Sequence, residues 1–147
     1  MEQIYPYVQI VHLICAIIFL GYIFFDVVIF MRLKGTLGAD FERIKKAIGS
    51  RAIKIMPVCL FTLIITGGMM MSRWVGSANG GYFGTPLQKI FMLKVALALI
   101  IAVCVAINLS CRAMGRPAPE FLRANIHKIA FVFGFIIVLC AKLMFVV

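Results

Sequence analysis

Four long runs of apolar residues alternate with short polar stretches along the chain. The runs extend from about Ile4 to Met31, from Ile53 to Met71, from Leu87 to Leu109 and, after a helical lead-in from Pro119, from Ile129 to Val147. A helix needs about 20 mainly apolar residues to cross the hydrocarbon core of a membrane. The pattern therefore predicts an all-α membrane protein, one domain over residues 1–147, with four transmembrane helices in an up-down bundle.

The polar stretches between these runs differ in charge. Residues 32–52 are predicted to form a basic connector in which 39–48 is a short interfacial helix beginning near Asp40. Residues 32–54 and 110–128 together hold eleven Lys and Arg side chains, whereas the other side holds only Arg73 and Lys89. The positive-inside rule places the first and third connectors in the cytoplasm and both chain termini outside it. The expected location is the bacterial inner (cytoplasmic) membrane, crossed several times.

Composition supports the membrane location and argues against a nucleic-acid-binding protein and a disulfide-bonded scaffold. Hydrophobic residues make up 64% of the chain, charged residues only 14%, and the net charge is +10. The positive charge lies in the connectors, without a basic patch interleaved with aromatic residues, so no nucleic-acid partner is expected. The five cysteines lie in or beside apolar runs without a CxxC pair, which is typical of small buried residues rather than a disulfide framework.

Ionisable side chains at membrane depth are the first candidates for function, because they are costly in lipid and usually face the bundle interior. Counted from the outer helix ends, His12, Lys94 and Lys142 lie about 7–12 Å deep. No acidic residue shares this level, so the group requires an anionic or electron-rich partner. A b-type haem would satisfy it, with His12 on the iron and the two lysines on the propionates. The alternative is a packing histidine with two lysines that extend towards the surface.

A second iron ligand is left open by the sequence. His127 lies near the cytoplasmic side, about 18–20 Å deeper than His12, so one iron cannot take both. The candidates are methionines predicted near the outer level: Met69, Met70, Met71 and Met92. The first three, together with His12, would also suit copper(I), because thioethers are soft ligands.

A second polar level is predicted near the cytoplasmic side. Its members are Asp26, Arg51, Arg123, Asn125 and His127. Ion pairing and the ordinary polarity of helix ends explain such a level without a function. The functional interpretation is a site for an anionic substrate. No catalytic residue is singled out.

Each of the four apolar runs contains a short motif around a polar residue, a proline or a glycine. The motifs are Val11-His12-Leu13-Ile14 with Gly21, Ile55-Met56-Pro57 with Leu60-Phe61-Thr62-Leu63 and Gly67, Leu93-Lys94-Val95-Ala96-Leu97, and Val138-Leu139-Cys140-Ala141-Lys142. Together they resemble motifs of the HemJ-type protoporphyrinogen IX oxidases and, more loosely, of the CopD-like membrane proteins. The family positions that match are His12, Lys94 and Lys142.

The resemblance implies a membrane oxidoreductase that binds haem b, oxidises protoporphyrinogen IX and passes the electrons towards quinone. The alternative is a non-catalytic haem or copper membrane protein in electron transfer or metal handling. The implied partners are the lipid bilayer, a quinone and a porphyrinogen, and a homodimer remains open.

The distribution of basic residues makes a prediction about topology. Alkaline phosphatase, which is active only outside the cytoplasm, should be active when fused after Val147 and inactive when fused after Met114. Positive-inside orientation is the physical reason, since the basic stretches are held on the cytoplasmic side. Colony assays of the two fusions measure it. Activity in the Met114 fusion alone would reverse the orientation and with it every depth assignment above.

Overall fold

The structure, a computed structural model, describes residues 3–146 apart from the side chain of Ala78. Over this range it is helical, with no strand beyond an isolated bridge between Gly76 and Gly81. Within the same range, four helices are long and apolar enough to cross a membrane: Tyr5–Leu37, Asp40–Met71, Pro86–Ala113 and Glu120–Leu143. The all-α class and the four predicted spans are confirmed, and the chain is a multi-pass membrane protein.

The chain divides into two compact units, Met1–Gly67 and Gly68–Val147. The boundary falls between two neighbouring glycines near the end of the second long helix, α3 (Asp40–Met71). The first unit contains the first long helix and most of α3, and the second contains the remaining two long helices. Each unit is described by itself below.

The first long helix begins with α1 (Tyr5–Phe24), which has Pro6 in its first turn, where a missing N–H costs little. It continues without a break through a π-helical segment (Phe25–Ile29), a 3-10 segment (Phe30–Leu33) and α2 (Lys34–Leu37). These 33 residues extend about 50 Å, well beyond a hydrocarbon core of about 30 Å. The helix therefore continues past the predicted end of the span at Met31.

The second long helix starts earlier than the hydrophobic pattern predicted. α3 begins at Asp40 rather than at Ile53 and includes the whole of 39–48 except its first residue. Asp40 and Glu42 stand in the first turn, where the helix dipole favours acidic side chains, and Asp40 pairs with Arg43 at 3.1 Å. The 32–52 stretch is thus not a connector with a separate interfacial helix. Its residues extend the two spans, because lysine, arginine and alanine continue a helix as readily as apolar residues do.

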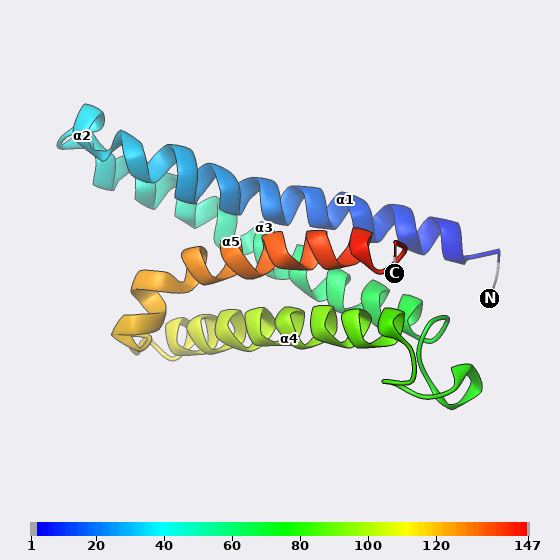
Figure 1. Cartoon of the computed structure of the whole chain (residues 1–147). Helices are drawn as coiled ribbons and strands as arrows, with labels where there is room; N and C mark the ends of the chain where they lie inside the picture. Colours follow the sequence, from blue (N-terminus) through cyan, green and yellow to red (C-terminus); the bar gives the residue numbers. More distant parts are fainter. Residues whose placement is uncertain (1–2, 147) are drawn as a thin grey trace. The chain divides into compact units, whose positions relative to one another are not determined.

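In the first unit, α1 and α3 form an antiparallel hairpin that turns at Gly38 (Figure 1). Gly38 has a φ of 51°, a conformation that side-chain-bearing residues seldom adopt. Near the turn the rings of Phe30 and Phe41 stack with centroids 5.0 Å apart, and at the far end His12 contacts Thr66. Many other large apolar side chains of these helices stay exposed, as expected for surfaces that face lipid.

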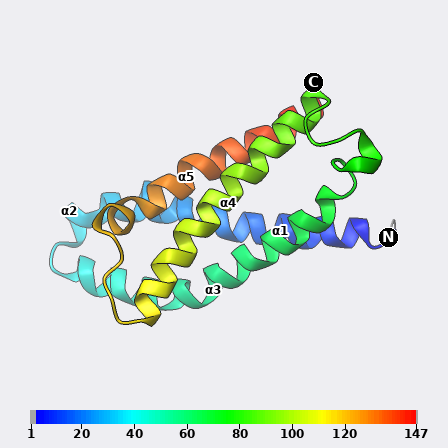
Figure 2. The same ribbon diagram turned by 90° about the horizontal axis from the view of Figure 1, so that it is seen from below.

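In the second unit, α4 (Pro86–Ala113) and α5 (Glu120–Leu143) pack side by side, as both views show (Figures 1 and 2). Their bounds lie within a few residues of the predicted ones at the ends nearest their connecting loop. At the opposite end of this pair, Val75, Phe91 and Met144 form a buried cluster. Beside it the Trp74 ring meets the Phe145 ring edge-on, with centroids 5.5 Å apart.

The glycine-rich loop before α4 is ordered by one buried side chain, that of Gln88. Its Oε1 accepts hydrogen bonds from the backbone N–H groups of Gly84 and Thr85, and its Nε2 donates to the Asn79 carbonyl at 2.8 Å. The Thr85 hydroxyl in turn accepts from the Gln88 N–H, which completes a capping box at the start of α4. The sequence Thr85-Pro86-Leu87-Gln88 carries the signature of this box.

Replacing Gln88 by leucine should loosen this loop and destabilise the second unit. The change leaves two backbone N–H groups and one carbonyl without their partner, at a cost of about 1–3 kcal/mol. Chymotrypsin should then cleave faster at the exposed Tyr82 and Phe83, and unfolding in mixed detergent micelles should need less denaturing detergent. Gln88→Glu, which keeps the acceptor oxygen, should have the smaller effect. Equal cleavage of the leucine variant and the parent would show that the loop does not depend on Gln88.

Candidate functional site

His12 lies in α1, half-buried, and faces α3 within the first unit. Its Nδ1 is 2.7 Å from the hydroxyl oxygen of Thr66, a buried residue in the last turns of α3. The Thr66 hydroxyl is also 2.6 Å from the carbonyl oxygen of Thr62, one turn earlier in the same helix. His12 is thus held by a short chain of hydrogen bonds that ends on the α3 backbone.

This chain of hydrogen bonds sets the protonation of the imidazole. The two short contacts of the Thr66 hydroxyl can both be hydrogen bonds only if its single proton is donated to the Thr62 carbonyl oxygen, which can only accept. The contact between Thr66 and His12 then requires the proton on Nδ1, which donates to the hydroxyl oxygen. A neutral His12 therefore carries its lone pair on Nε2. That is the arrangement of a histidine that ligates a metal through Nε2.

Two features of the first unit make room for the imidazole. A Cβ built on Gly67 would lie 3.4 Å from His12 Cε1, so the glycine lets the ring lie close to the α3 backbone. One turn along α1, the thiol of Cys15 lies near enough to the Cys59 thiol of α3 to interact with it. Both cysteines are reduced. Small residues of both helices thus lie beside His12 or within a turn of it on α1.

The two lysines predicted at the level of His12 belong to the second unit. Lys94 of α4 is half-buried, and its ammonium group lies 4.4 Å from the centre of the Phe91 ring. Lys142 is exposed in the last turn of α5. Their position beside His12 stays a prediction from depth along the helices.

The candidate methionine ligands differ in their surroundings. Met71 and Met92 both pack against the apolar cluster of Val75, Phe91 and Met144, which is ordinary core packing. Met69 is exposed and Met70 is half-buried. Among the residues that the structure describes, no group of three or more His, Cys, Asp or Glu side chains is placed to hold a metal ion. A haem needs only one such side chain, and His12 remains the candidate.

The residues predicted for a cytoplasmic polar level are divided between the units. Asp26 is buried in the π-helical segment of the first unit, one turn after Tyr22, and Arg51 is exposed on α3. Asn125 of α5 donates its side-chain N–H to the Phe121 carbonyl at 3.1 Å. Arg123 and His127 line one pocket in the second unit, which Asn125 does not line.

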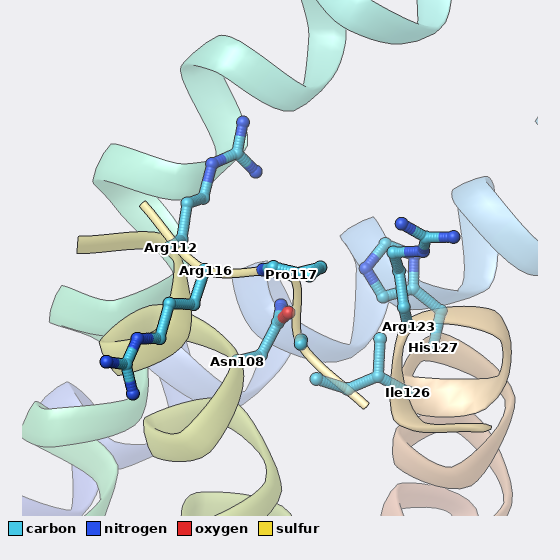
Figure 3. A pocket seen from close by; sticks show the side chains of 8 residues that line it. Asn108, Arg112, Arg116, Pro117, Arg123, Ile126 and His127 are labelled. Carbon is cyan, nitrogen blue, oxygen red and sulfur yellow. The ribbon is translucent and has the colours of Figure 1, made fainter. Parts of the chain in front are cut away.

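This pocket lies where α4 ends and α5 begins and has a volume of about 300 Å³. Arg112 and Arg116 stand on one side of it and Arg123 and His127 on the other, with Asn108 and Pro117 between them (Figure 3). The remaining lining residues are Ala118 and Ile126. The sequence already predicted a site for an anion at this level, with Arg123 and His127 among its residues. That Arg112 and Arg116 line the same pocket depends on how the 114–119 turn folds.

No protein-family model matches this chain, and neither a curated protein nor a solved structure is significantly similar to it. The class to which the chain belongs is therefore defined by its own helices, as a multi-pass helical membrane protein.

The hydrogen bond between His12 and Thr66 should make a measurable contribution to stability. In a double-mutant cycle with His12→Phe and Thr66→Val, we expect a coupling free energy of about 0.6 kcal/mol and at most about 1.7 kcal/mol, the range for polar pairs between membrane helices. Unfolding in mixed detergent micelles measures it on cofactor-free protein. Thr62→Val, which keeps the backbone carbonyl, serves as the control and should show no coupling. Strict additivity of His12 and Thr66 would mean that the contact adds nothing to stability.

Proposed function

We propose that this chain is a membrane oxidoreductase that binds a b-type haem through Nε2 of His12. The observation that carries the proposal is the chain of hydrogen bonds from His12 Nδ1 through the Thr66 hydroxyl to the Thr62 carbonyl. Metal-ligating histidines almost always donate their other N–H in this way, which fixes the tautomer and the plane of the ring.

Small residues surround His12 on both helices of the first unit, and they support the proposal. Gly67 lets the imidazole lie close to the α3 backbone, because a side chain at this position would contact the ring. On α1, the residues one turn away are Val8, Cys15 and Ala16, which are small. When bound, a haem would supply a one-electron redox centre at His12. The residues of this chain would hold that centre, orient its ligand and set the electron density on Nε2.

The orientation that we propose follows the basic residues. Both termini lie outside the cytoplasm and the four helices alternate in direction, so that His12 belongs to the outer half of the first span. The membrane is the bacterial inner membrane, where a quinone pool can accept electrons.

The substrate and the acceptor rest on the family resemblance. Motifs around His12, Lys94 and Lys142 are similar to those of HemJ-type oxidases, which implies oxidation of protoporphyrinogen IX with electrons passed towards quinone. A haem protein without this activity is the alternative, and the two differ in one assay. Anaerobic protein given protoporphyrinogen IX and a soluble quinone should produce fluorescent protoporphyrin only if the chain is an oxidase.

Replacing His12 tests the proposal directly. Purified His12→Ala should lose the Soret band that we expect in the parent protein, because the variant lacks the iron ligand. His127→Ala is the matched control, since it removes the other histidine, and it should keep most of the band. Absorption spectra at equal protein concentration, oxidised and reduced, measure both.

Two outcomes would overturn this assignment. One is a parent protein that contains no haem even when expressed with excess haem. The other is full haem occupancy in both histidine variants. If haem binds as expected and His12→Ala removes it, but no porphyrin forms, the haem site stands and the oxidase activity does not.

A further inference from the structure

The pocket between the end of α4 and the start of α5 is lined by several cationic side chains. Arg112, Arg116 and Arg123 line it, and no carboxylate is among its lining residues. Glu120 is the only acidic side chain in the sequence from Gly68 onward. Three arginines that line one small space, with no carboxylate among the lining residues, favour an anionic ligand.

The lining also supplies the hydrogen-bond geometry that an anion needs. Each guanidinium offers several donors in a planar fork, which matches phosphate and carboxylate oxygens two at a time. The Asn108 side chain lies between the two arginine-bearing sides and adds an amide that can donate from the middle of the pocket (Figure 3). All three arginines are exposed, so their long side chains can turn towards a ligand without disrupting a packed core.

The height of the pocket along the helices places it at a membrane surface. α4 has 28 residues and so extends about 42 Å, against about 30 Å for the hydrocarbon core. Asn108 and Arg112 lie in its last two turns and hence at the level of the lipid headgroups. Two large apolar side chains at the same end of the hairpin, Met114 and Phe121, are 63% and 71% exposed. Cationic and apolar groups side by side are typical of a surface that contacts lipid.

We propose that this pocket binds the phosphate group of an acidic phospholipid headgroup, with Arg112 and Arg123 as its main partners. A volume of about 300 Å³ is at the lower limit for ligand pockets, which suits a headgroup and not a tetrapyrrole. Basic pockets between transmembrane helices bind acidic headgroups by the same chemistry. The site is separate from His12 and does not depend on haem. A soluble phosphate ester shares the chemistry and is distinguished by the experiment.

The test uses the full chain in a neutral detergent and native mass spectrometry. Short-chain phosphatidylglycerol is titrated, with phosphatidylcholine as the zwitterionic comparison and inorganic phosphate in a separate series. Arg112→Gln and Arg123→Gln should each weaken phosphatidylglycerol binding about tenfold or more, because each removes a charged hydrogen-bonding partner. Lys128→Gln is the matched control: it makes the same change in charge on α5 at a residue outside the pocket, and should change binding less than about twofold.

The outcomes separate a built site from general attraction to positive charge. Preference for phosphatidylglycerol over phosphatidylcholine that Arg112→Gln and Arg123→Gln remove, but Lys128→Gln keeps, supports the proposal. Partial rescue by Arg112→Lys would support it further, since lysine restores charge without the fork. Equal losses in all three glutamine variants would overturn it in favour of diffuse electrostatics. Arginine-dependent binding of inorganic phosphate with no preference for phosphatidylglycerol would overturn the lipid assignment and indicate a soluble ester.

Discussion

Inside a bilayer no water is present to take up a hydrogen bond, and the structure follows from that constraint. Every backbone N–H and C=O group in the hydrocarbon core must have a hydrogen-bond partner. A helix is the structure in which a single membrane-spanning segment provides these partners itself. Side-chain hydroxyls and amides are governed by the same requirement. Thr62 and Thr66 each donate a hydrogen bond to a backbone carbonyl one turn earlier in α3.

The contact between His12 and Thr66 has a definite direction because of this same requirement. In water, the hydroxyl of Thr66 could donate to the imidazole or accept from it with little difference in free energy. In α3, its proton is committed to the Thr62 carbonyl, so only acceptance remains. A residue without charge and without metal-binding chemistry thereby decides which nitrogen of His12 carries the lone pair. The hydrogen bond of a threonine hydroxyl to its own helix backbone usually has no chemical role, but here it fixes the tautomer of His12.

The number of spans was predictable from the sequence, since long apolar runs have few alternatives to a membrane helix. The start of α3 at Asp40 was not predictable in this way. Hydropathy shows which part of a helix contacts lipid, but it does not show how far the helix continues beyond the lipid. Thr85 and Gln88 have the sequence signature of a capping box, which predicts the start of α4 at Pro86. His12 was recognisable from its depth alone. Thr66 was not, since its pairing depends on the register between α1 and α3, and Arg112 meets Arg123 only through the fold of the 114–119 turn.

The π-helical segment at Phe25–Ile29 gives the first long helix a local property that its neighbours lack. One turn of π-helix contains more residues than one turn of α-helix, so this segment has an extra residue compared with α-helical geometry. Loss of one residue in this segment could be absorbed by reversion to α geometry, with the faces on either side unchanged. In α1 itself, a deletion would rotate the remainder of the helix by about 100°. The length of this span is therefore adjustable at one place, and that place contains the buried Asp26.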